Sequence, residues 1–340
     1  MHCDRSMLFT TDAPVRDKIQ KMRDRIRWQQ SPLIQRRIDQ TQLVIDDGQG
    51  DDASQDFAFM VLGDSGTGRH RGDSPQRQVA EALLTYGQEA RFTLHTGDVV
   101  YLVGSSEQYA DNFIAPYREH LVGGEMPRQI AYDSMVFRRP FLPTLGNHDY
   151  YDLPLLGGIA SMLTKPLRRL VKAYVDFDLG WHGSYTGEAF ARAFIDYLSG
   201  ISESRLAAHL DRQYTAQSPT GQRCLRYRPS EFTRVPNRYY SFRYGGIDFF
   251  ALDSNTFNIP QPLGNDAEGR QLRQQLTATL KQLKSRQQQC LEVMAHYNSS
   301  TEDTDGEALA DRTAEAEQIA EQIRDIKQQL GDGPGSSTVD

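Results

Sequence analysis

Three short motifs supply side chains that could hold metal ions. They are Gly63–Gly66 (Gly-Asp-Ser-Gly), Gly97–Tyr101 (Gly-Asp-Val-Val-Tyr) and Gly146–Asp149 (Gly-Asn-His-Asp). The oxygen donors among them are Asp64, Asp98, Tyr101 and Asn147. Such donors suit a pair of metal ions that share one carboxylate, and two ions about 3.5–4 Å apart can hold both oxygens of an in-line displacement at phosphorus. The chemistry that these residues predict is therefore metal-assisted hydrolysis of a phosphoester.

The elements that must position these motifs can be read from the apolar runs before them. The motifs end three strand-like runs, at Phe57–Leu62, Arg91–Thr96 and Phe137–Leu145, and a helix-like stretch at Gln76–Tyr86 lies between the first two. Strand, helix, strand is the pattern of a parallel unit, and ligand sites in open α/β sheets collect at the carboxyl ends of the strands. We therefore expect an α/β fold with the three loops at one edge of a sheet.

Taken in this order, the three motifs resemble those of the calcineurin-like metallophosphoesterases. The closest resemblance is to the purple-acid-phosphatase-like branch, because the first motif lacks the usual histidine and the second ends in Tyr101. The aromatic stretch Asn237–Asp253, with a two-glycine turn, is similar to the later strands of this family. The resemblance covers about residues 56–258. It implies a β-sandwich flanked by helices.

The resemblance also implies a ligand set. Asp98 would bridge two metal ions, Asp64 and Tyr101 would complete the first, and Asn147 would bind the second. The ions would be divalent or trivalent Fe, Mn or Zn. A hydroxide bound by both would hydrolyse a phosphate mono- or diester, so the expected partner is a phosphorylated small molecule or another phosphoester substrate.

Two further residues would act in catalysis by the same resemblance. His148 would stabilise the transition state or protonate the leaving oxygen, and Asp149 would orient His148. A proton donor of this kind needs a fixed position and a pKa near the working pH.

The chain departs from the family in its later histidines. It has no Gly-His-x-His sequence, and after His148 only His182, His209 and His296 remain. His296 fits best in the end of a helix that begins near Gln271. We therefore expect the chain to stop before the last part of its domain. An alternative is a non-catalytic phosphoesterase-like scaffold or fragment that binds a partner through its C-terminal helices.

A second alternative is nucleotide triphosphate hydrolysis. Gly63–Gly68 has the glycine spacing of a P-loop, but Arg69 and His70 stand where that motif requires Lys and then Ser or Thr. The missing lysine disfavours this interpretation.

Composition limits the other possibilities. Residues 301–340 contain eleven acidic and three basic residues, so the other 300 residues are close to neutral and nothing indicates a nucleic-acid partner. No apolar run approaches the roughly 18 residues of a membrane-spanning helix. The first residues lack the apolar core of a signal peptide, and the three cysteines are far apart. These features predict a cytoplasmic location.

The expected organisation has three parts. Residues 1–55 form an N-terminal helical arm and linker, and residues 56–258 form the metallophosphoesterase-like domain, in which 151–212 is a helical, cap-like insertion. Residues 259–340 form a helical hairpin, with helices beginning near Gln271 and at Ala308, and an acidic tail. This hairpin is a possible surface for a protein partner.

Overall fold

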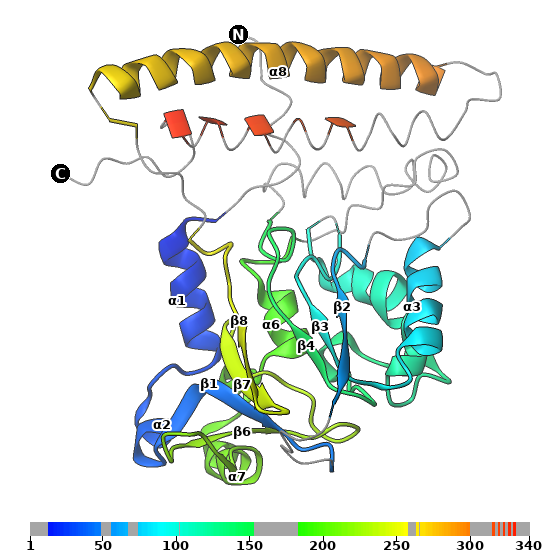
Figure 1. Cartoon of the computed structure of the whole chain (residues 1–340), viewed down its shortest axis with the longest axis vertical. Coiled ribbons are helices and arrows are strands. Elements are labelled where there is room, and N and C mark those ends of the chain that lie inside the picture. The colour runs from blue at the N-terminus through cyan, green and yellow to red at the C-terminus, as the bar shows by residue number, and fades with distance from the viewer. Residues whose placement is uncertain are drawn as a thin grey trace. The chain divides into compact units, whose positions relative to one another are not determined.

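A computed structural model describes residues 13–48, 56–66, 74–101, 103–152, 183–257, 263–264 and 266–299, together with helical residues between 315 and 330. The chain divides into two compact units (Figure 1). The larger contains Met7–Leu170 and Asp176–Phe257, and the smaller contains Asn258–Asp340 with two short segments from elsewhere in the chain. The two units are described separately below.

The larger unit contains a three-stranded parallel sheet, which confirms the expected α/β class. Its strands are β2 (Ala58–Leu62), β3 (Ala90–His95) and β4 (Phe141–Pro143), in that order. Leu62 lies opposite His95, and His95 lies opposite Pro143. Because the strands are parallel and in this register, their carboxyl ends lie at one edge, where the three motifs follow.

The second sheet of this unit is mixed. Its order is β5-β6-β1-β7-β8, with β1 parallel to both β6 and β7 and the outer pairs antiparallel. The strands are β1 (Ile38–Ile45), β5 (Ala216–Gln217), β6 (Arg223–Tyr227), β7 (Tyr240–Tyr244) and β8 (Ile247–Ala251). The ring of Phe92 on β3 meets those of Phe242 and Phe249, with centroids 5.5 and 5.3 Å apart. Aromatic packing therefore joins the two sheets.

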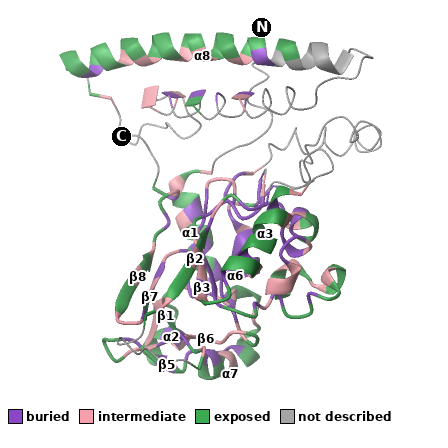
Figure 2. Cartoon of the chain, turned by 45° about the vertical axis from the view of Figure 1, so that its right-hand side comes forward, coloured by how far each residue is buried: buried purple, intermediate pink, exposed green. Residues whose placement is uncertain are grey.

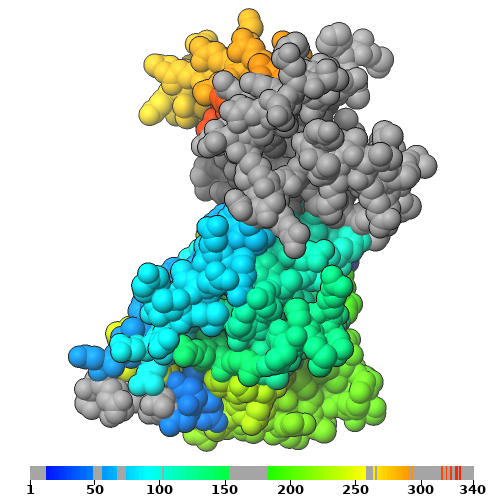
Figure 3. Space-filling model, turned by 90° about the vertical axis from the view of Figure 1, so that its right-hand side faces the viewer, coloured from blue at the N-terminus to red at the C-terminus, as the bar shows by residue number. Residues whose placement is uncertain are grey.

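Five α-helices and several shorter turns complete the described part of the larger unit. The helices are α1 (Val15–Arg25), α2 (Ser31–Gln35), α3 (Pro75–Tyr86), α6 (Glu188–Phe194) and α7 (Glu203–Gln213). The turns are η2 (Ser106–Gln108), η3 (Ala110–Ile114), η4 (Arg118–His120), η5 (Pro127–Gln129), η6 (Tyr132–Ser134) and η7 (Leu198–Gly200). In the space-filling view, α3 shares one face of the unit with residues that follow it to about residue 145 (Figure 3).

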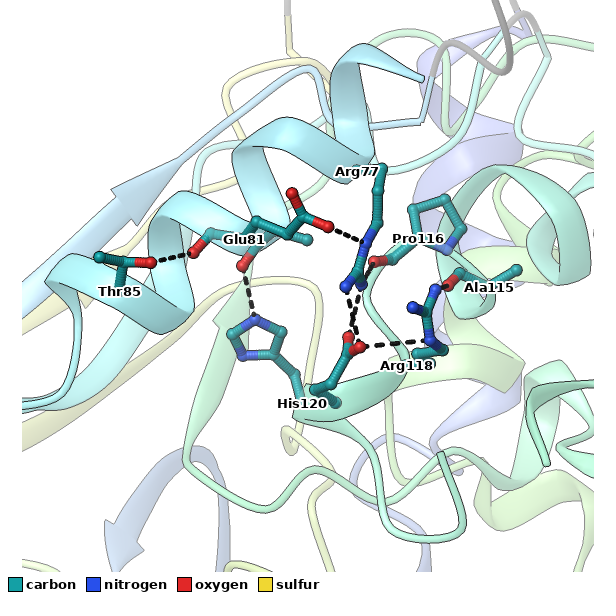
Figure 4. A network of polar contacts seen from close by, with 9 residues as sticks. Arg77, Glu81, Thr85, Ala115, Pro116, Arg118 and His120 are labelled. Atoms are coloured by element: carbon teal, nitrogen blue, oxygen red, sulfur yellow. Dashed lines mark hydrogen bonds and ion pairs between the residues drawn. The ribbon is translucent and has the colours of Figure 1, made fainter. Parts of the chain in front are cut away.

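Helix α3 is fastened to the segment that ends at His120 (Figure 4). Arg77 donates to the Pro116 carbonyl at 2.8 Å and through both terminal nitrogens to the Glu119 carboxylate. The His120 ring lies 3.4 Å from the Ala80 carbonyl. Since α3 connects β2 to β3, these contacts fix the crossover that makes the two strands parallel.

The division of residues 1–55 into a helical arm and a linker omitted a strand. The helical arm is present as α1, and residues 38–45 then form β1 at the centre of the mixed sheet. The polar side chains of this stretch hide its strand character. Gln40 is buried, and its amide oxygen and nitrogen pair with the Gln29 N–H and the Ile26 carbonyl. A buried polar side chain is tolerated when both of its ends are hydrogen-bonded.

Two other expectations concern the middle of the chain. The aromatic hairpin is present as β7 and β8, with Gly245 and Gly246 at positive φ in its turn. Residues 183–212 of the proposed insertion contain α6, η7 and most of α7, while residues 153–182 lie outside the described part of the chain.

The smaller unit is built around one long helix, α8 (Ala267–Ser299), which includes His296 as expected. Buried residues of this unit pack together in a small cluster: Cys290, Ala316, Ile319 and Ile323, with Leu280 and Leu283 against them. Arg286 on α8 pairs with Glu315 at 2.6 Å. Helical residues between 315 and 330 therefore pack on α8, as expected for a helical hairpin. Most of the described residues of α8 are nevertheless exposed (Figure 2). Among the described residues, no helix has the length and apolar character needed to span a membrane.

Candidate metal centre

The first two motifs are held against each other by their backbones. The N–H of Asp64 donates to the Gly97 carbonyl at 3.1 Å, the N–H of Ser65 to the Asp98 carbonyl at 3.2 Å, and the N–H of Tyr101 to the Gly66 carbonyl at 3.0 Å. These three bonds place the Asp64 and Asp98 loops side by side beyond β2 and β3.

The oxygen donors meet at this point. The Tyr101 hydroxyl donates to the Asp64 carboxylate and, at 3.1 Å, to Oδ2 of Asp98. The other oxygen of Asp98, Oδ1, accepts the backbone N–H of His148 at 2.9 Å. Asp64, Asp98 and Tyr101 are thus linked directly, and the third motif contacts the same carboxylate.

Asn147 and His148 lie beside this cluster. The Asn147 amide nitrogen donates to the Tyr151 hydroxyl at 2.8 Å. The His148 ring is half-buried, and its centroid lies 4.3 Å from that of Tyr101 and 5.0 Å from that of Tyr151. Two aromatic rings therefore fix the position of the imidazole next to Asp98.

Asp149 has a different role from the expected one of orienting His148. Its side chain is completely buried, and it accepts the backbone N–H groups of Asp98, Val99 and Gly146 at 2.9, 3.2 and 2.9 Å. Burial, followed by the charge of Asp98, raises the pKa of Asp149 well above its usual value. A carboxyl group enclosed in this way cannot reach a substrate. We therefore assign Asp149 to positioning the second and third loops.

Glycine is required where these loops touch. A Cβ atom at Gly146 would overlap the Asp98 carboxylate, and one at Gly97, whose φ is +116°, would lie 2.7 Å from the Gly146 nitrogen. Asp64 and Asp98 have φ values of 53° and 56°. Left-handed backbone is costly for residues other than glycine, although Asp accepts it better than most.

The electrostatics of the cluster favour a bound cation. Burial raises the pKa of Asp98, and the charge of Asp64 raises it further, although His148 opposes the shift. Burial and the two carboxylates also raise the pKa of the Tyr101 hydroxyl. Asp98 and Tyr101 thus resist carrying negative charge beside the Asp64 carboxylate, and a cation between these groups would relieve that cost.

Sequence reasoning missed one pair behind the cluster. His95 is buried, its Nδ1 accepts the Gly97 N–H at 3.2 Å, and its Nε2 lies 2.8 Å from the Ser65 hydroxyl. Because Nδ1 accepts this hydrogen bond, the neutral ring carries its proton on Nε2, which donates a hydrogen bond to the Ser65 hydroxyl. Burial lowers the pKa of His95 to about 3. The only sequence signal for this pair was a histidine at the end of an apolar strand. A histidine in that position is usually a core residue without a direct role in a site.

Of the later histidines, His209 makes its described contacts elsewhere in the larger unit. His209 lies 2.9 Å from the Asp196 carboxylate and packs on the ring of Phe232. His296 belongs to the smaller unit, and His182 lies outside the described residues. Within the described ranges, no three or more His, Cys, Asp or Glu side chains gather as a metal site. The side-chain oxygens that the structure links here are those of two carboxylates, Asp64 and Asp98, and one phenol, Tyr101.

Comparison with known proteins adds no relative. No family model matches the sequence, and neither the search of curated proteins nor the search of solved structures returns a significant match.

Proposed function

We propose that the larger unit is a metal-dependent phosphoesterase of the calcineurin-like type that hydrolyses a phosphate mono- or diester. The observation that carries the proposal is the direct linkage of Asp64, Asp98 and Tyr101 at the carboxyl edge of a parallel sheet. Oxygen donors from separate loops, all directed at one point beyond a sheet edge, are typical of a ligand site.

The residues present fit a metal-binding role. Asp64, Asp98 and Tyr101 would hold one ion, and Asp98 with Asn147 would contribute to a second. The free-energy cost of placing the charges of Asp64 and Asp98 together supports this assignment. Asp98 is buried beside Asp64, and among the described residues no arginine or lysine donates a hydrogen bond to it. Bound ions would supply Lewis acidity toward water and phosphate oxygens.

His148 would act on the substrate. Its backbone N–H holds Asp98, while its ring is positioned by the rings of Tyr101 and Tyr151. An imidazole fixed in this way can donate a proton to the leaving oxygen or stabilise charge on the phosphoryl oxygens. Asp149 and His95 would keep the three loops in register without touching the substrate.

The test combines metal content with turnover of a generic phosphomonoester and phosphodiester. Asp98→Asn and Asn147→Ala are expected to lower metal content and to reduce kcat/KM at least about 100-fold. Asp24→Asn, which alters an exposed carboxylate on α1, is the matched control and should change neither quantity. Unchanged turnover in Asp98→Asn and Asn147→Ala would exclude the proposed site.

One observation favours a second candidate, a non-catalytic scaffold. In the described part of the larger unit, the only histidine ring that contacts the oxygen cluster is that of His148. A protein that retains its fold, binds no metal after incubation with Mn, Zn or Fe, and hydrolyses neither ester would support the scaffold over the enzyme. In that case the helices of the smaller unit would be the surface to examine for a partner.

A further inference from the structure

A hollow lies at the opposite edge of the parallel sheet from the candidate metal centre. It has a volume of about 740 Å³ and is lined by the first residues of β2 and β3 and by residues just before β4. Small-molecule sites usually have volumes of about 300–1,000 Å³. At about 3.3 Å per residue, strands of five or six residues separate the two edges by roughly 17–20 Å. A ligand here would not touch the metal centre.

Charged side chains dominate the lining of this hollow. Three are basic and three are acidic: Arg91, Arg138, Arg139, Asp47, Asp56 and Glu89. Two of the six already pair with other side chains. The Tyr244 hydroxyl donates to Asp47 at 2.6 Å, and Arg138 pairs with Glu125 at 2.8 Å. The hollow therefore offers its remaining cations and anions to an occupant.

Arg91 and Arg139 form the unusual part of the lining. Thr93 lies opposite Phe141 in the parallel pair of β3 and β4, and Arg91 and Arg139, two residues before these positions, both line the hollow. Arg139 gives one terminal nitrogen to the Gly87 carbonyl, while the guanidinium of Arg91 has no hydrogen bond or ion pair within the described residues. Two guanidiniums that line one hollow suit a planar or tetrahedral oxyanion.

The acidic residues restrict what else the occupant can carry. Asp56 and Glu89 are exposed at the hollow, and within the described part of the chain neither forms an ion pair with Arg91 or Arg139. A simple polyanion would meet these carboxylates as well as the arginines. An occupant with an oxyanion at one end and an amine at the other would satisfy both.

We infer that this hollow binds a small zwitterion, with a phosphate or carboxylate group held by Arg91 and Arg139 and an amino group directed to Asp56 and Glu89. This inference is independent of the proposed phosphoesterase activity, because the hollow shares no residue with the metal centre.

The test is calorimetric titration of the full chain with two matched probes, phosphoethanolamine and β-alanine. The protein carries Asp98→Asn, so that phosphate binding at the candidate metal centre is removed. Tighter binding of phosphoethanolamine would identify a phosphate ligand, and tighter binding of β-alanine a carboxylate ligand. Inorganic phosphate and ethanolamine, which each carry half of the charge pattern, should bind more weakly than either zwitterion.

Variants locate the binding. Arg91→Ala should raise the Kd of the more tightly bound zwitterion about tenfold or more, because charge-assisted hydrogen bonds are lost. Arg139→Lys keeps the positive charge but loses the paired N–H donors of the guanidinium, so it should raise the Kd by a smaller factor. Arg205→Ala, an exposed arginine on α7, is the control and should leave the Kd unchanged. Equal binding by Arg91→Ala, or no binding of either zwitterion up to about 10 mM, would overturn the inference.

Discussion

His95 shows how a residue without a ligand role can still control the site. It holds Ser65 with one ring nitrogen and Gly97 with the other, and these neighbours adjoin Asp64 and Asp98. The bond from the Gly97 N–H requires the neutral ring, since a protonated imidazole has no acceptor for it. The burial of His95 therefore links the geometry of the oxygen cluster to its protonation.

This linkage predicts how stability depends on pH. The pKa of His95 is about 3 in the folded chain, against about 6.5 for an unperturbed histidine. Between these values the unfolded chain binds a proton that the folded chain does not. The His95 contribution is therefore complete above about pH 6.5, and the free energy of unfolding falls by roughly 1.4 kcal/mol per pH unit as the pH decreases toward 3.

Urea unfolding at several pH values between 7 and 5 checks this prediction. His95→Asn, which keeps one donor and one acceptor, should be less stable at pH 7 but should lose stability less steeply on acidification. Equal slopes for the unmodified chain and the variant would show that His95 is not the responsible group.

The sequence indicated which residues gather at the candidate site better than it indicated what each of them does there. Asp64, Asp98, Asn147 and His148 could be selected because they follow apolar runs, and Tyr101 through the resemblance to the phosphoesterase motifs. The role of Asp149 could not, because its partners are three backbone N–H groups whose directions depend on the folded loops. His95 was hidden for a similar reason, since Ser65 approaches it only after β2 and β3 have paired.

At the scale of elements, the position of α3 depends strongly on Arg77. This side chain joins the helix to the Pro116 carbonyl and to Glu119, and it also pairs with Glu81 on its own helix. The Arg77 side chain is only 21% exposed, so these charge-assisted bonds are partly shielded from water. Bonds of this kind contribute more than those of a fully exposed ion pair.

Arg77→Ala should therefore lower the free energy of unfolding by about 1–3 kcal/mol. Arg77→Lys should recover part of the loss, since a lysine can pair with Glu119 but cannot donate to both of its oxygens and to Pro116 together. The measurement is urea unfolding followed by circular dichroism, with Arg205→Ala as the exposed control. A loss no larger than that of the control would mean that packing alone holds α3.

Elements were predictable where hydrophobic spacing was regular. The parallel strands, the aromatic hairpin and α8 follow such patterns. β1 was missed because its buried Gln40 interrupts the apolar pattern. The stretch from Tyr109 to His120 contains a π-helix and a 3-10 helix, and the buried rings of Phe113 and Tyr117 stack on each other there. Tertiary packing of aromatic side chains can override local helical preference.

At the scale of the whole molecule, the two compact units have separate cores. The larger core is rich in aromatic side chains, whereas residues 258–340 contain a single aromatic residue, Tyr297. The smaller cluster buries four residues, with Leu280 and Leu283 against them. Since hydrophobic stabilisation scales with the apolar area buried, the smaller unit should be much the less stable.

We expect two transitions in urea. The far-ultraviolet dichroism of α8 should decrease first, while the near-ultraviolet signal of the aromatic core persists to higher urea. Ile319→Ala should move only the first transition, because Ile319 belongs to the smaller cluster. Coincident loss of both signals, with or without the substitution, would mean that the chain unfolds as one cooperative unit.

The pairing of β1 with β6 and β7 marks the limit of sequence reasoning at this scale. The paired positions, Val44 with Arg226 and Gln42 with Ser241, are far apart in the chain. Nothing in a local pattern of hydrophobic residues specifies which distant strands will become neighbours. The local parallel sheet, whose strands follow one another in the sequence, did not have this difficulty.

The left-handed backbone at Asp64 and Asp98 has a consequence for how this chain can change over evolutionary time. Glycine would adopt those angles at little steric cost, and asparagine more readily than most residues. Each aspartate therefore sits where a different residue would make the protein more stable, by an amount on the order of 1 kcal/mol. If the proposed metal site is tested and fails, both positions should accept glycine with a gain in stability. On the proposed function, two carboxylates in fixed positions are what this loss of stability provides.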